Sequence, residues 1–261
     1  MPPNQILSSP TDLPTGPLVD CQWIVFDAVG TLIDPNPSVA VAYHAVGSRY
    51  GSRLDVAEVG NRFRSAFRRS EQDGFPGGPT QQWVTSDVIE EARWRWIVGE
   101  VFPDVTDPER CFQELWDHFA QPSSWVCFPD VGDSLNQLIA GGYRLALASN
   151  FDRRLHSVCE AIPQLNGIEQ CIVSATVGLR KPAPGFYSAV LQACDCAPDE
   201  ILMVGDNHDY DVLAPRSAGF RALHLDRNAA QGAPGQLRSL PELLAMTACN
   251  SPALPHGRAG E

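Results

Sequence analysis

The stretch that decides the fold is residues 23–32, WIVFDAVGTL. Its first four residues are continuously apolar, which is typical of a short strand buried on both faces of a parallel sheet. The run stops at a carboxylate, Asp27, and Gly30 follows, so the chain leaves the strand in a polar turn. We therefore predict a strand over 23–26 that presents a charged side chain at its carboxyl end.

Similar apolar runs follow at 145–148, 171–173, 201–204 and 221–225. Between these later runs, apolar residues at three- and four-residue spacing predict helices at about 130–141, 152–163, 184–195 and 209–218. Strands and helices in alternation imply a parallel sheet with right-handed crossovers, covered by helices on both faces. The predicted core is a three-layer α/β fold.

The first two predicted strands are separated by a long interval that is mostly helical in pattern. Helices are predicted at 40–51, 56–71, 86–102 and 109–120, with a break at 73–80, DGFPGGPT. An insertion directly after the first strand lies over the carboxyl ends of the strands, where open α/β sheets bind ligands. We expect a core formed by 21–34 and 127–247, a helical cap over 35–126, and flexible tails at 1–20 and 248–261.

Composition excludes several classes of function. The 261 residues are 44% hydrophobic and carry a formal net charge of −12, which disfavours nucleic acid and membrane surfaces as partners. No apolar stretch approaches the roughly 18 residues of a membrane span. The N-terminus has neither the basic nor the apolar region of a secretory signal, and the eight cysteines form no CxxC pair. We expect reduced thiols and a cytoplasmic location, and the oligomeric state stays open.

Polar side chains follow the buried strands. They are Asp27, Ser149, Asn150, Lys181, Asp206, Asp209 and Asp211. Lys181 is the only lysine in the chain, where 18 other basic residues are arginine, so this position favours a compact ammonium group. In a parallel sheet these side chains converge on one edge, where a divalent cation and the lysine would relieve the repulsion between carboxylates. Such a site suits a transferring phosphoryl group that one carboxylate attacks.

Four of these segments, in order and spacing, resemble the motifs of the haloacid dehalogenase (HAD) superfamily. They are Asp27-Ala28-Val29-Gly30-Thr31-Leu32, Ser149-Asn150, Lys181-Pro182 and Gly205-Asp206-Asn207-His208-Asp209-Tyr210-Asp211. The likeness extends over about residues 21–230, and the insertion resembles the superfamily's helical cap of the first type. The resemblance implies a Rossmann-like core, Mg²⁺ as cofactor in the phosphatase branches, and an aspartyl-enzyme intermediate.

The resemblance also implies roles for individual residues. Asp27 would be the nucleophile, Ser149 would bind a phosphoryl oxygen, and Lys181 would orient both. The implied metal ligands are Asp27, the backbone carbonyl of Val29, Asp206 and Asp211. The resemblance also groups Thr31 and Asn150 with the substrate-binding residues. Thr31 would steady the first loop, and Asn150 would line the site.

Val29 departs from the phosphatase pattern, which usually has a second Asp at this position as general acid and base. Such catalysis is typically worth about 10²–10⁴ in rate, so Val29 predicts weak activity unless another group replaces it. His44, His118 and His208 are candidates for that group. Haloacid dehalogenases also lack the second Asp, because halide leaves without a proton, but they use no metal and lack the acidic fourth motif.

The predicted helix over 56–71 concentrates arginines in an otherwise acidic chain. Arg64 and Arg68 lie four residues apart on one face, and we expect one of them to bind an anionic substrate or leaving group. Together these features favour Mg²⁺-dependent hydrolysis of a small phosphomonoester through an aspartyl-phosphate at Asp27. Two alternatives stay open: a metal-free 2-haloacid dehalogenase, and a catalytically impaired binding or regulatory protein.

Overall fold

The core of the protein is a six-stranded sheet in which every neighbouring pair of strands is parallel. The computed structural model describes residues 21–229 and 236–247, so the predicted tails at 1–20 and 248–261 lie outside the described residues. The strand order is β5-β4-β1-β6-β7-β8. The strands are β1 (Trp23–Phe26), β4 (Arg144–Ser149), β5 (Ile168–Val173), β6 (Ile201–Gly205), β7 (Arg221–Leu225) and β8 (Gln236–Leu237).

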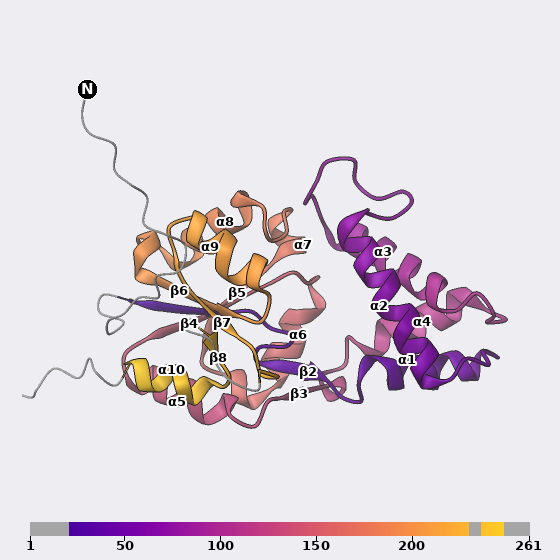
Figure 1. Ribbon diagram of the computed structural model, residues 1–261, viewed down its shortest axis with the longest axis horizontal. Coiled ribbons are helices and arrows are strands. Elements are labelled where there is room, and N and C mark those ends of the chain that lie inside the picture. Colours follow the sequence, from indigo (N-terminus) through magenta and orange to yellow (C-terminus); the bar gives the residue numbers. More distant parts are fainter. Residues whose placement is uncertain (1–20, 230–235, 248–261) are drawn as a thin grey trace, which may run out of the picture.

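Helices cover both faces of this sheet, which gives three layers (Figure 1). Alternate residues of β1 point to opposite faces, as a strand requires. Ile24 and Phe26 pack with α5 (Val131–Ala140), α6 (Arg154–Ala161) and α10 (Leu240–Thr247). Trp23 and Val25 pack on the other face with α8 (Pro184–Cys194). The predicted α/β class is confirmed, with a core that is apolar on both sides of β1.

Shorter helical segments complete the core. They are α7 (Ser174–Val177), α9 (Ala214–Ser217), a π-helical turn at His208–Leu213 and short 3-10 helices at Pro122–Ser124, Pro163–Leu165 and Pro198–Glu200. The helix predicted at 209–218 is therefore divided between the π-helical turn and α9.

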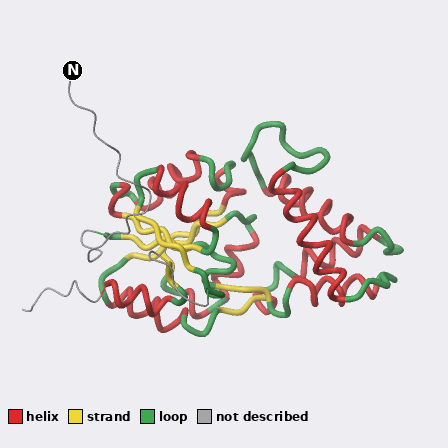
Figure 2. Tube along the Cα trace, viewed as in Figure 1, coloured by secondary structure: helices red, strands yellow, loops and turns green. Residues whose placement is uncertain are grey.

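The insertion between β1 and β4 folds as four helices, which form the separate helical region at the right of Figures 1 and 2. They are α1 (Val39–Arg49), α2 (Val56–Gln72), α3 (Asp87–Val101) and α4 (Pro108–His118). Asp55 accepts a hydrogen bond from the backbone N–H of Glu58 and so caps α2, while Ser86 caps α3 in the same way. The helices enclose an apolar cluster of their own, which includes Tyr43.

The cap contacts the core at several places. Near the start and end of the insertion, β2 (Ile33–Pro35) pairs antiparallel with β3 (Trp125–Cys127), and the predicted domain boundaries fall within this ribbon. The loop between α2 and α3 also reaches the core, where the backbone N–H of Thr85 donates to the carbonyl of Gly178 at 3.1 Å. None of the described helices is both long and apolar enough to cross a membrane.

Candidate active site

The carboxyl ends of β1, β4 and β6 bring the predicted site residues together at one edge of the sheet. Asp27 follows β1, and its backbone N–H donates to the carbonyl of Val204 at 2.9 Å. Lys181 is 2% exposed, and its Nζ donates to Asp27 Oδ1 at 2.8 Å and to Asp211 Oδ1 at 2.6 Å. A buried ammonium therefore bridges the carboxylate that follows β1 and a carboxylate of the π-helical turn after β6.

Two glycines allow the acidic side chains to approach the backbone. Gly30 has φ +84°, a left-handed conformation that a side chain would strain, and a Cβ there would lie 2.6 Å from Asp206 Oδ2. At Gly205 a Cβ would lie 2.3 Å from Asp211 Cγ. Any larger residue at either position would push a carboxylate out of the cluster.

Asp27, Asp206 and Asp211 form a cluster that could hold a metal ion, because each offers an oxygen within 4.8 Å of the others. Burial raises the pKa of Asp206 to about 7, with the charges of Asp27 and Asp211 adding to the effect. Burial also raises the pKa of Asp211 to about 6, although Lys181 opposes it. Three carboxylates share one ammonium, and an all-oxygen donor set with excess negative charge fits a hard divalent cation such as Mg²⁺.

A cavity of about 710 Å³ lies between the cap and this cluster. From the core it is lined by Asp27, Val29, Ser149, Asn150, Lys181, Asp206 and Asp211. From the cap, Arg64 and Arg68 line it. Most of the predicted site residues therefore line one cavity.

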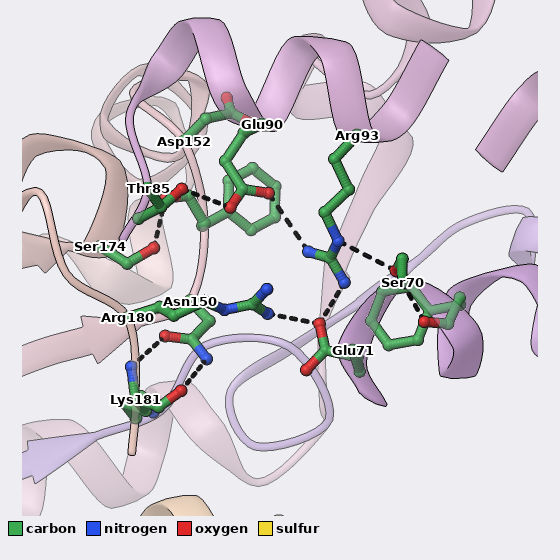
Figure 3. Close-up of polar contacts among 12 residues, drawn as sticks. Ser70, Glu71, Thr85, Glu90, Arg93, Asn150, Asp152, Ser174, Arg180 and Lys181 are labelled. Carbon is green, nitrogen blue, oxygen red and sulfur yellow. Dashed lines mark hydrogen bonds and ion pairs between the residues drawn. The ribbon is translucent and has the colours of Figure 1, made fainter. Parts of the chain in front are cut away.

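Asn150 and Thr31 contact other site residues. Asn150 Oδ1 accepts from the backbone N–H of Lys181 at 2.7 Å, and its Nδ2 donates to the Lys181 carbonyl at 3.0 Å (Figure 3). Thr31 is fully buried, donates to Asp206 Oδ1 at 3.3 Å, and is not among the described residues that line the cavity. Asn150 thus fixes the lysine loop, and Thr31 steadies a carboxylate of the cluster.

The four arginines of α2 differ in their partners. Arg62 pairs with Glu58, and Arg69 pairs with Glu100. Arg64 donates to Asn61 Oδ1 at 2.6 Å, and Arg68 has no hydrogen-bond or ion-pair partner in the part of the chain that the structure describes. The two arginines that line the cavity are therefore the two that no described carboxylate neutralises.

An ion-pair network beside the cavity was not predicted from the sequence. Glu71 of α2 pairs with Arg93 of α3 and with Arg180 of the core (Figure 3). The Tyr210 hydroxyl also donates to Glu71 at 3.2 Å. Burial alone would raise the pKa of Glu71, but Arg93 and Arg180 hold it below its usual value. The one signal in the sequence was Arg180, directly before the only lysine.

No histidine lines the cavity among the described residues, so His44, His118 and His208 are not placed to replace a general acid there. His118 contacts the Ser124 hydroxyl at 3.3 Å, and His208 is an exposed residue beside Asp209.

The comparison with protein families agrees with this architecture. A family model described as haloacid dehalogenase-like hydrolase matches residues 21–219. The chain belongs to this family. Among the relatives of this HAD-like hydrolase is the haloacid dehalogenase-like hydrolase domain-containing protein 3 of Danio rerio, 28% identical over 82% of this chain and 88% of that protein. A phosphoglycolate phosphatase of Vibrio vulnificus is also 28% identical, with the same shares covered.

Solved structures of other HAD-like proteins share the fold. An L-2-haloacid dehalogenase matches with a TM-score of 0.69 and 20% identity, over 88% of this chain and 100% of the other. A magnesium-bound HAD-hydrolase of Bacillus subtilis matches with a TM-score of 0.65 and 15% identity, over 87% of this chain and 98% of the other.

Proposed function

We propose that this HAD-like hydrolase cleaves small phosphomonoesters through an aspartyl-phosphate at Asp27, with Mg²⁺ as cofactor. The observation that carries the proposal is the buried Lys181 between Asp27 and Asp211, with Asp206 completing a carboxylate cluster. These three carboxylates carry more negative charge than Lys181 offsets, so they suit a divalent cation better than a metal-free halide pocket. The phosphoglycolate phosphatase among the relatives supports the same class of substrate.

Asp27 is the proposed nucleophile. Its Oδ1 accepts from Lys181, and no hydrogen bond within the described chain engages Oδ2, which is left to attack phosphorus. Lys181 holds the carboxylate in one orientation and places positive charge beside the phosphoryl group. Ser149, which is 3% exposed and lines the cavity, donates its hydroxyl proton to a phosphoryl oxygen.

Asp27, Asp206, Asp211 and the backbone carbonyl of Val29 would hold the Mg²⁺ ion. The ion supplies positive charge that offsets the phosphoryl oxygens and the excess of carboxylates. Arg64 and Arg68 draw the anionic substrate into the cavity, and the cap excludes water from it.

A metal-free 2-haloacid dehalogenase is the second candidate. Val29 lines the cavity beside Asp27, where a phosphatase of this type usually has its general acid, and a halide leaves without one. Metal dependence separates the two candidates. A protein that is silent in both reactions but binds Mg²⁺ and a phosphate analogue would be a binding or regulatory module.

The test is phosphate release from a panel of phosphomonoesters, with Mg²⁺ and with chelator. The Asp27→Asn variant should abolish release. Asp209→Asn is the matched control, because Asp209 lies two residues before Asp211 but is exposed and outside the cavity lining. Release that needs both metal and Asp27 supports the proposal. Halide release from 2-haloacids in chelator, without phosphate release, would replace it by the second candidate.

A further inference from the structure

The cavity has aromatic walls in addition to its carboxylate cluster. Phe63, Phe67 and Trp94 of the cap lie with ring centroids 5.9 to 6.4 Å apart, and all three line the cavity. Trp116 of the cap and Phe151 of the core line it as well. Each of these residues is only partly buried, so some of its surface stays available to a ligand. Arg93 lies over the rings of Phe67 and Trp94, and Arg154 lies over that of Trp116. An apolar, flat group would bury surface here that a polyhydroxylated one would not.

The same cavity is poor in groups that could protonate a leaving oxygen. Val29 offers only methyl groups. Glu71 is held in ion pairs with Arg93 and Arg180, so it stays a carboxylate, and Tyr210 already donates its hydroxyl proton to Glu71. Apart from Glu71 and the metal cluster, Asp34 is the one carboxyl group among the described residues that line the cavity. It lies on β2 and is exposed.

Without an acid, the leaving group has to depart as an anion. The conjugate acid of a phenolate has a pKa of about 10, as in the tyrosine side chain. An alkoxide is closer to hydroxide, whose conjugate acid, water, has a pKa of about 15.7. The lack of a proton therefore slows the loss of an alkyl alcohol far more than the loss of a phenol.

We propose that the substrates are aryl phosphomonoesters, in which the alcohol is a phenol that fills the aromatic part of the cavity. This inference rests on the proposed phosphatase function. The Asp27 carboxylate oxygen attacks phosphorus, the bond from phosphorus to the aryl oxygen breaks, and both bonding electrons leave on the phenolate, which takes its proton from solvent. Water then attacks the aspartyl-phosphate, the bond to Asp27 breaks, and inorganic phosphate departs after the water gives up a proton to it or to solvent.

The first test is a leaving-group series in which substituted phenyl phosphates are compared with alkyl phosphates. In the wild type, kcat/KM should fall steeply as the pKa of the leaving alcohol rises. Val29→Asp should flatten this dependence and speed alkyl esters by about 10²–10⁴-fold, the usual effect of general acid catalysis. Val29→Asn is the matched control, because it has the same shape as Asp and no acidic proton, and it should leave the dependence steep.

A second test measures binding alone, in case Val29→Asp disturbs the carboxylate cluster. Phenylphosphonate and methylphosphonate share the anionic group and differ in the ring. With Mg²⁺ present, we expect the wild type to bind phenylphosphonate about tenfold more tightly than methylphosphonate or better, because the ring buries apolar surface. Quenching of tryptophan fluorescence measures this binding. The quenching should decrease in Trp94→Leu but persist in Trp96→Phe, since Trp96 does not line the cavity.

Three results would overturn the aryl-ester inference and leave the phosphatase proposal standing. They are equal turnover of alkyl and aryl esters by the wild type, equal affinity for the two phosphonates, and a steeper leaving-group dependence in Asp34→Asn, which would make Asp34 the acid. If neither series gave Asp27-dependent phosphate release, both proposals would fall together.

Discussion

Glu71 of the cap forms an ion pair with Arg180 of the core, and Arg180 directly precedes Lys181, the buried lysine of the site. The backbone N–H of Arg180 also donates to the carbonyl of Trp83 in the cap, at 2.9 Å. On the other side, Asn150 holds the backbone of Lys181 through two hydrogen bonds. One short segment of the core is thus fastened to the cap at one residue and to the site at the next.

We expect Glu71→Gln to destabilise the protein by about 1.5–3 kcal/mol, the usual contribution of hydrogen bonds to charged groups. The variant leaves buried Arg180 without a described carboxylate partner and leaves Arg93 with Glu90 alone. Urea denaturation measures the effect. Glu100→Gln breaks the exposed pair with Arg69 and should cost less than about 1 kcal/mol. Equal losses in the two variants would show that the buried network has no special role.

Binding of Mg²⁺ should weaken as the pH falls. With the pKa of Asp206 at about 7 and that of Asp211 at about 6, both groups are largely protonated at low pH in the metal-free protein. A cation must displace these protons, so we expect the apparent Kd to rise about tenfold or more between pH 8 and pH 5.5. Titration calorimetry in buffers of different ionisation enthalpy would also count the released protons. A Kd independent of pH would contradict the metal assignment.

The stability of the metal-free protein should fall as the pH rises, whereas Mg²⁺ binding should strengthen. Because the pKa of Asp206 is raised from 3.8 in the folded protein, protons bind the folded state more tightly than the unfolded chain. That contribution is fully present below pH 4 and is lost as the pH rises through about 7. We expect Tm in chelator to fall over this range and added Mg²⁺ to restore it at pH 8. The Asp206→Asn variant should show a smaller fall.

Arg64→Ala and Arg68→Ala should raise KM for anionic substrates with less effect on kcat. Both side chains line the cavity without a described carboxylate partner, so they attract anions. The attraction should weaken with ionic strength, and kcat/KM of the wild type should fall as salt is added. Arg62→Ala is the control, because Arg62 is paired with Glu58 and lies outside the cavity lining. Unchanged KM in both test variants would refute the substrate-binding role.

Lys181→Arg should lose about 10²-fold or more in kcat/KM, although the charge is kept. The ammonium fits between two carboxylate oxygens in a fully enclosed space, and a planar guanidinium is larger and differently shaped. Arg110→Lys, at an exposed position of α4, should have no effect. Full activity in Lys181→Arg would mean that any cation suffices at this position.

The parallel sheet and the cap helices could be predicted from the sequence because each has a strong local pattern. The β1 run is apolar throughout because β4 and β6 flank it on both sides and helices cover both faces. The ribbon of β2 and β3 was missed because each strand has three residues, too few for a period to show.

The candidate site was partly predictable for a related reason. Asp27 and Asp206 come directly after buried strands and Ser149 is the last residue of one, so topology alone places them together. The pair of Glu71 and Arg180 joins residues 109 positions apart, and nothing in the local sequence around Glu71 marks its partner. Contacts between the cap and the core depend on how the two pack, which local periodicity does not encode.

The single lysine gives the chain a spectroscopic property. Lys181 is the only lysine in 261 residues and is buried at the centre of the cluster. Isotope labelling of lysine alone would therefore produce one NMR resonance for each labelled atom type, with no background from the surface. Its chemical shift would follow cation binding, phosphorylation of Asp27 and movement of the cap, without any engineered label.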